Sequence, residues 1–185
     1  AGTEPEQHPV EPPAKATPAS ELESKLTSVC DGLLLYLDRH EELFPRDRYA
    51  DNGEPLLSWR VEILPFIGQE ALYESLHKDE SWDSEHNLQV WKQAPPRLFA
   101  ASSSTKDGYA DVLAVTGAFD LSFAPDSREK TVSIFEIHRK DGLDRTAILV
   151  HGAASAAVPW TKPGDFTWNE QVAFEKMGNP GESFF

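Results

Sequence analysis

The sequence has one cysteine, few basic residues and no long apolar run. A single Cys among 185 residues excludes an internal disulfide framework and a multi-cysteine zinc site within one chain. Only 17 Lys and Arg stand against 31 Asp and Glu, which gives a formal net charge of −14. Such a surface repels phosphate backbones, so we expect no nucleic-acid partner. No apolar run approaches the about 18 residues that cross a bilayer, and no signal-peptide pattern is present, so we expect membrane attachment only through segments outside this sequence.

Sequence motifs of catalysis are also lacking. The segment Gly152–Ala156 does not have the second glycine of a hydrolase nucleophile elbow. No glycine-rich phosphate loop occurs, and the six His residues do not form a His-Glu-x-x-His pattern. A carboxylate pair for glycoside hydrolysis cannot be singled out among 31 acids. We therefore predict that the protein is not an enzyme.

The first 19 residues have a composition of their own. Five of them are Pro, and almost none carries a large apolar side chain. Such a segment buries too little surface to offset its ordering entropy. We predict that residues 1–19 form a Pro-rich disordered tether, which is either a spacer or simply a disordered terminus. Residues 20–185 then form a single domain.

A helical pattern begins at Ser20, which matches a capping box with Glu23. Large apolar residues then recur at steps of three and four, which is typical of one helix face: Leu22, Leu26, Val29, Leu33 and Leu37, widened by Leu34, Tyr36 and Leu43. Pro45 ends the pattern. We predict an amphipathic helix over residues 20–43, with Leu33 and Leu37 buried against a sheet.

The rest of the sequence predicts short helices and then strands. Residues 56–67 suit a short helix interrupted at Pro65, and residues 69–77 suit another. Residues 110–115 are typical of a strand, while residues 131–137 and 146–150 predict a hairpin around the turn at residues 140–142. A long helix followed by such strands is an α+β arrangement, with the helix packed on a small antiparallel sheet and a loop-rich middle.

An acidic segment lies in that middle. Carboxylates crowd residues 74–87, and hard oxygen donors in one loop attract calcium, for which the first candidates are Asp79, Asp83 and Glu85. His77 and His86 favour a transition metal instead. An acidic face in contact with solvent explains the same charges without any metal.

The five Trp residues, at positions 59, 82, 91, 160 and 168, also have two interpretations. Exposed indole rings form stacking platforms for sugars, whereas most Trp side chains are partly buried framework. In the first interpretation the candidate ligand-binding residues are Trp59, Arg60, Trp82 and Trp160.

An ordered string of residues resembles a known family. It contains Ser58-Trp59-Arg60-Val61, Ile63-Leu64-Pro65-Phe66, Gln69, Leu72-Tyr73, Trp82-Asp83 and Asn87. In order and spacing it resembles pseudopilin-like proteins abundant in planctomycete bacteria, a family catalogued as a domain of unknown function and also as a solute-binding family. Phe44-Pro45, Asp141-Gly142 and residues 158–165 match further blocks, and the similarity covers residues 26–175.

The resemblance implies a pilin-like fold, similar to the major pseudopilins of type II secretion. It also implies an extracytoplasmic location, in the periplasm or at the cell surface, and no known catalysis. The family's prepilin leader and membrane-spanning helix half do not occur in this sequence, and we expect the domain to lack the family's last strand. Trp59, Arg60, Trp82, Asn87 and Asp141 correspond to framework positions, with Arg60 paired to an acid.

Two functions follow from these observations. The first is a non-catalytic, pseudopilin-like structural or interaction module of the cell envelope, with protein partners or self-association. The alternative is an extracellular module that binds a small solute or carbohydrate through the Trp-rich middle.

Overall fold

The computed structural model describes residues 18–93, 98–116, 133–140, 142 and 146–167. Residues 1–17 of the tether predicted over residues 1–19 lie outside the described part, whereas Pro18 and Ala19 belong to the first helix. The helices are α1 (Pro18–Arg39), α2 (Trp59–Glu62), η1 (Leu64–Ile67), α3 (Glu70–Ser75), α4 (Glu85–Gln93), α5 (Ile134–Lys140) and η4 (Ala154–Ala156). The strands are β1 (Tyr109–Ala110), β2 (Val112–Thr116), β3 (Leu149–His151), β4 (Val158–Pro159) and β5 (Phe166–Thr167). The fold is α+β with an N-terminal helix, as predicted.

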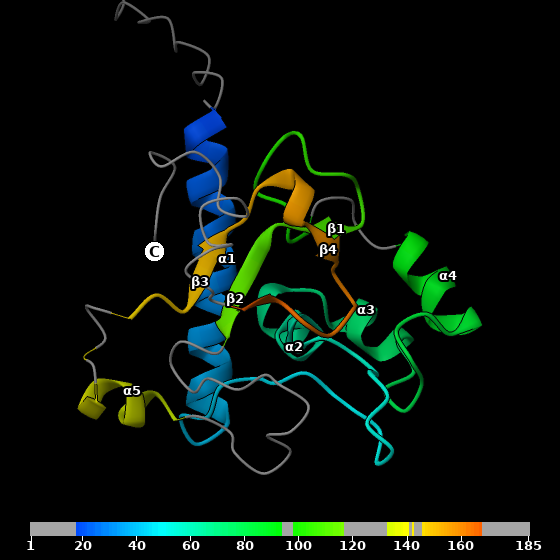
Figure 1. Ribbon diagram of the computed structural model, residues 1–185, viewed down its shortest axis with the longest axis horizontal. Coiled ribbons are helices and arrows are strands. Elements are labelled where there is room, and N and C mark those ends of the chain that lie inside the picture. Colours follow the sequence, from blue (N-terminus) through cyan, green and yellow to red (C-terminus); the bar gives the residue numbers. More distant parts are fainter. Residues whose placement is uncertain (1–17, 94–97, 117–132, 141, 143–145, 168–185) are drawn as a thin grey trace, which may run out of the picture.

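The strands form two small sheets. In the larger one β2 is central, antiparallel to β3 and parallel to β5. In the smaller one β1 pairs antiparallel with β4. Figure 1 shows α1 running alongside β2 and β3, with α2, α3 and α4 extending to the other side of β2. None of the helices in the described ranges is both long and apolar enough to cross a membrane.

One face of α1 contributes to the core. Leu26, Val29 and Leu33 are buried in a cluster that includes residues of η1, β2 and β3. Gly32 permits the close approach of η1, because a Cβ at this position would lie 2.4 Å from Cγ2 of Ile67. Leu37 is also buried, but not against the sheet as predicted. It packs in a separate cluster with Phe44, which follows the helix, and with residues of α5.

The ends of α1 differ from the prediction. The helix starts at Pro18, so Ser20 lies inside it and is not its N-cap. It ends at Arg39 rather than near residue 43, because Glu41 adopts left-handed backbone angles (φ 55°) and the Glu42 N–H donates to Leu37 O at 3.0 Å. This hydrogen bond closes the helix at two residues with positive φ, Glu41 and Glu42 (φ 63°), without help from proline.

The middle of the chain agrees with the prediction more closely. Residues 59–67 contain a helical turn, α2, followed by the 3-10 turn η1, and Pro65 lies at the start of η1. Gly68 ends η1 in a left-handed conformation (φ 73°), which glycine adopts without steric cost. The predicted helix at residues 69–77 is the shorter α3.

The predicted hairpin is wrong. Residues 134–140 form α5, in which Ile134 and Ile137 lie on one helix face and pack against the cluster of Leu37. Gly142 (φ 81°) donates its N–H to Ile137 O at 3.1 Å, so it caps a helix instead of forming a hairpin turn. The strand β3 pairs with β2 instead. A spacing of three places the two isoleucines on one face of a helix, whereas in a strand they would point to opposite faces, so this spacing favours the observed helix.

Candidate functional site

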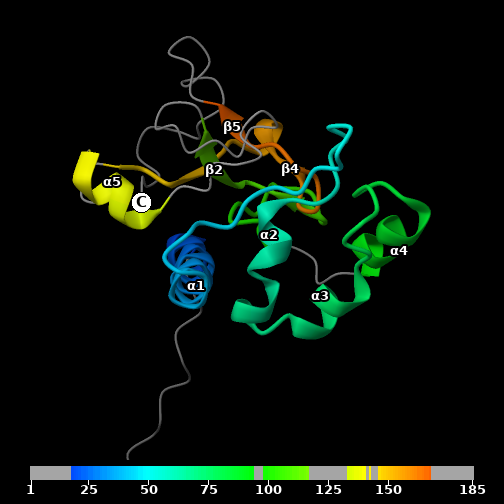
Figure 2. The same cartoon turned by 90° about the horizontal axis from the view of Figure 1, so that it is seen from below.

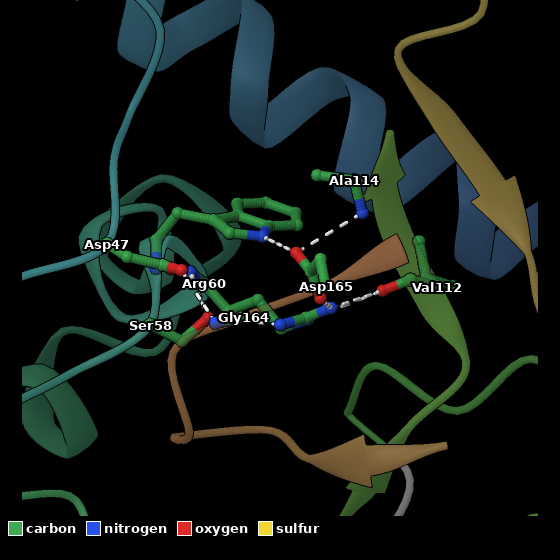
Figure 3. A network of polar contacts seen from close by, with 8 residues as sticks. Asp47, Ser58, Arg60, Val112, Ala114, Gly164 and Asp165 are labelled. Carbon is green, nitrogen blue, oxygen red and sulfur yellow. Dashed lines mark hydrogen bonds and ion pairs between the residues drawn. The ribbon is translucent and has the colours of Figure 1, made fainter. Parts of the chain in front are cut away.

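Trp59 and Arg60 lie at the centre of a buried polar network (Figure 3). Both belong to the ordered string of residues that resembles a known family. Arg60 forms an ion pair with Asp165, and both side chains are 0% exposed. The guanidinium also donates to Val112 O at 2.8 Å and to Ser58 Oγ at 3.0 Å. Arg60 therefore joins α2, β2 and the segment before β5, and the prediction that it pairs with an acid is confirmed.

Asp165 is held by three donors from two elements, α2 and β2. One carboxylate oxygen accepts from Arg60 and the other from the indole N–H of Trp59 and the backbone N–H of Ala114, the last at 3.3 Å. The Arg60 guanidinium lies 4.9 Å from the centroid of the Trp59 ring. Burial raises the pKa of Asp165, while the charge of Arg60 and these hydrogen bonds oppose that rise.

A second carboxylate, Asp47, belongs to the same network. It accepts the backbone N–H groups of Trp59 and Gly164, each at 2.7 Å. Burial, and then the negative charge of Asp165, raise the pKa of Asp47 to about 7. Two buried carboxylates thus share one buried cation, Arg60. Through Gly164, Asp47 also connects the start of the loop-rich middle to a segment 117 residues further along the chain.

Three of the four candidate ligand-binding side chains are inside the protein. Trp59 and Trp160 are each 1% exposed, and Arg60 is fully buried. A solute cannot stack on an indole ring that other side chains already cover, so for these three the structure corrects the ligand-binding interpretation and favours framework roles. Trp82 is partly exposed, and the Lys162 ammonium lies 5.4 Å from its ring centroid.

The acidic segment is organised around Asn87 rather than around a cation. The buried Asn87 side chain accepts from His77 N at 2.9 Å and donates to the carbonyl oxygens of His77 and Ser81, both at 3.0 Å. It therefore fixes the connection between α3 and α4, as expected for a framework position. Hydrogen bonds from Ser84 and then His77 lower the pKa of Glu80.

The predicted metal candidates lie at the surface of this segment. Asp79, Asp83 and Glu85 are exposed, and Asp83 accepts a hydrogen bond from the Ser81 hydroxyl. His77 and His86 stack with ring centroids 3.5 Å apart and nearly parallel planes. Within the described ranges no three His, Cys, Asp or Glu residues converge as metal ligands would. Calcium binding here stays a prediction.

No sequence pattern predicts a further buried acid, Asp111. It separates β1 from β2 and accepts the backbone N–H groups of Ala101 at 2.6 Å and Ser102 at 2.9 Å, together with the Thr105 hydroxyl. His151 Nε2 lies 3.6 Å away. Burial opposes ionisation, but these polar contacts together lower the pKa of Asp111. The absence of a local motif around Asp111 explains why sequence patterns do not find it.

Three large apolar side chains of the described residues are exposed at the surface. Leu34 is 58% exposed and Leu35 is 52% exposed on α1, and Phe135 is 66% exposed on α5. Leu34 was expected to widen the buried stripe of the helix, and its exposure corrects that expectation. Figure 2 shows α1 nearly end-on at the edge of the molecule, with α2 and the strands on its inner side. The exposed residues Asp31, Leu34, Leu35 and Asp38 share one side of this helix, which we call its outer face.

The fold and the buried network are those of a small α+β domain with an N-terminal helix and a polar framework. A family model described as a protein of unknown function (DUF1559), with the short name SBP_bac_10, matches residues 31–181. The chain belongs to this family. No curated protein and no solved structure matches the chain.

Proposed function

We propose that this chain is a non-catalytic, extracytoplasmic interaction module of the cell envelope, which contacts its protein partner through the outer face of α1. Membership of the DUF1559 family is compatible with this function but does not specify it. The pseudopilin-like motifs of the sequence support the location and the use of an N-terminal helix.

The exposure of Leu34 and Leu35 is the observation that carries the proposal. Two adjacent leucines, each more than half exposed on a helix at the edge of the molecule, place apolar surface in water. Exposed apolar surface of this kind is typical of protein contact sites when it is grouped and rimmed by polar residues. The polar residues Asp31 and Asp38, both exposed, lie one helical turn to either side.

The buried network supports the same function. Arg60, Asp165 and Asp47 connect four separate segments of the chain, so the loop-rich middle is fixed to the sheet. Each of these groups is satisfied by other groups of the protein, and the network is an internal support for the surfaces around it.

Native electrophoresis of mildly solubilised envelope fractions tests the proposal. The wild-type chain should occur in the envelope fraction and migrate above the mass of a monomer. The L34Q/L35Q variant should occur in the same fraction but migrate as a monomer. The matched control is T27Q/S28Q, which changes two exposed residues on the same helix and should migrate like the wild type. Equal migration of the wild type and L34Q/L35Q contradicts the proposal, and so does recovery of the chain in the cytoplasmic fraction.

A second candidate function rests on Trp82. Its indole is partly exposed, and Lys162 lies over the ring, so an anionic or neutral sugar has one aromatic surface and one cation to contact. The short name of the family model favours solute binding. A Trp82→Ala variant separates the two functions, because solute binding requires a sugar-dependent rise in melting temperature that this variant loses.

A further inference from the structure

The described part of the chain exposes two apolar sites on different helices. One consists of Leu34 and Leu35 on α1, and the other is Phe135 on α5. In Figure 1 α5 lies beside the C-terminal end of α1, and Ile137 of α5 packs on Leu37 of α1. The two sites therefore lie on two helices that pack against each other, and both are exposed.

The site on α1 is acidic. Asp31 precedes Leu34 and Leu35 by three and four residues, and Asp38 follows them by the same spacing, so all four residues share one helix face. The one basic residue among the exposed positions of the described part of α1 is Arg39, at its C-terminal end, and its guanidinium lies 3.8 Å from Asp38. The leucines are thus flanked by carboxylates on both sides.

The site on α5 is basic. The last turn of this helix carries His138, Arg139 and Lys140, all exposed. Phe135 and Arg139 are four residues apart, which places them on one face. The one acidic residue of α5, Glu136, accepts a hydrogen bond from the Ser133 backbone N–H at 3.4 Å. Phe135 is thus an apolar group with cations one turn further along.

We propose that α5 of one copy of this chain binds the outer face of α1 of a second copy, an inference that rests on the proposed function and names the partner. Phe135 packs on Leu34 and Leu35, and Arg139 pairs with Asp31 or Asp38. The spacing agrees, since Phe135 to Arg139 and Leu34 to Asp38 are both four residues, or about 6 Å of helix rise. The charges are complementary, which favours this pairing over one between two α1 faces or two α5 faces.

The contact is heterologous, because it joins two different surfaces. A bound pair keeps one unused α1 face, on one copy, and one unused α5 face, on the other, so association continues into an open chain unless rotation closes a ring. The net charge of −14 opposes close packing of many copies. The assembly therefore depends on the local pairing of Arg139 and Lys140 with Asp31 and Asp38, and it weakens as salt screens these charges.

A charge-exchange experiment on the purified chain tests the inference. Sedimentation velocity at low salt should show concentration-dependent association of the wild type. The variants D31K/D38K and R139E/K140E should each lose affinity by about tenfold or more, because each brings like charges together. Mixing the two variants should restore association, since the acidic α5 of one then meets the basic α1 of the other. The matched control for D31K/D38K is D51K/E54K, which makes the same change of net charge at two exposed positions and should associate like the wild type.

Three results would overturn the inference: a wild type that stays monomeric at every concentration, variants that associate as the wild type does, or a mixture that fails to regain association. Thermal melts of both variants establish that they are folded, and the mixture itself would not recover if they were not. If the purified chain is monomeric while the L34Q/L35Q substitution still dissociates the complex from envelope fractions, the proposed function stands and the partner is another protein.

Discussion

Asp47 and Asp165 are two buried carboxylates that share a single buried cation. Arg60 pairs directly with Asp165, whereas Asp47 is held by the backbone N–H groups of Trp59 and Gly164. The charge of Asp165 is the main electrostatic reason, after burial, why the pKa of Asp47 rises to about 7. Tyr49 is a further ionisable group near this site. Burial and the charges of the two acids raise the pKa of Tyr49 to about 12.

This relationship makes stability depend on pH. The folded pKa of Asp47, about 7, lies above the value of about 3.9 for an unfolded Asp. The folded protein therefore binds the proton more tightly, and this stabilisation is fully present below pH 4 and is lost as the pH rises to about 7. We expect the free energy of unfolding, from urea titrations, to fall between about pH 4 and pH 7. Asp47→Asn should flatten that slope, and Asp51→Asn, at an exposed position, should not. Equal slopes for the wild type and Asp47→Asn would contradict the account.

The ion pair between Arg60 and Asp165 should behave as a coupled unit. Arg60→Met leaves the Asp165 carboxylate buried without its cation, and such a change costs about 3–5 kcal/mol. The double variant R60M/D165N removes both charges and should be less destabilised than the sum of the two single variants. Urea denaturation of the four proteins gives the coupling energy. Purely additive losses would mean that the two side chains do not depend on each other.

Neighbouring leucines on α1 should differ sharply. Leu33 is buried in the main core, so Leu33→Ala should cost about 2–5 kcal/mol. Leu34 is exposed, and Leu34→Ala should stay within about 0.5 kcal/mol of the wild type when measured below the concentration at which the chain associates. Chemical denaturation of both variants measures this difference. Similar losses at the two positions would mean that the outer face of α1 is covered in the monomer.

Calcium binding by the acidic segment remains a separate prediction. Exposed carboxylates at Asp79, Asp83 and Glu85 repel one another, and a divalent cation relieves that repulsion. At about one hundred times its dissociation constant, calcium should stabilise the protein by about 2.7 kcal/mol. Thermal melts in calcium and in a chelator, compared for the wild type and D83N/E85Q, measure the effect. Coincident melts of the wild type would leave a solvated acidic face.

The sequence predicts those parts of the structure that depend on local periodicity. The apolar stripe of Leu26, Val29 and Leu33 locates the buried face of α1, and Pro65 marks the change from α2 to η1. The sequence-based prediction fails at residues 131–137, where β-branched residues favour a strand although the spacing of three between Ile134 and Ile137 is helical. Here packing on Leu37 decides for a helix. The stripe includes Leu33 but does not define how wide the covered face is, so Leu34 is taken to widen it. The position of η1 beside Gly32 determines which side of the helix is covered.

The polar network is predicted only in part, for a similar reason. A resemblance to a known family points to Trp59 and Arg60, and it indicates that Arg60 pairs with an acid. It does not say which of 31 acids that is. Asp165 lies 105 residues further along the chain, and only the tertiary fold brings the two together. Asp47 and Asp111 follow no motif, since each is held by backbone donors outside its own short segment: Gly164, 117 residues away, for Asp47, and Ala101, 10 residues away, for Asp111.

The central claim is that the outer face of α1 is a protein contact site in the cell envelope. A photo-reactive amino acid placed at position 35 tests it most directly, with position 51 as the control, because both residues are exposed and only the first lies on this face. Irradiation of intact cells should give one discrete cross-linked product from position 35 and none from position 51. A product with twice the mass of the chain identifies a second copy as the partner. No product from position 35, or the same products from both positions, would contradict the claim.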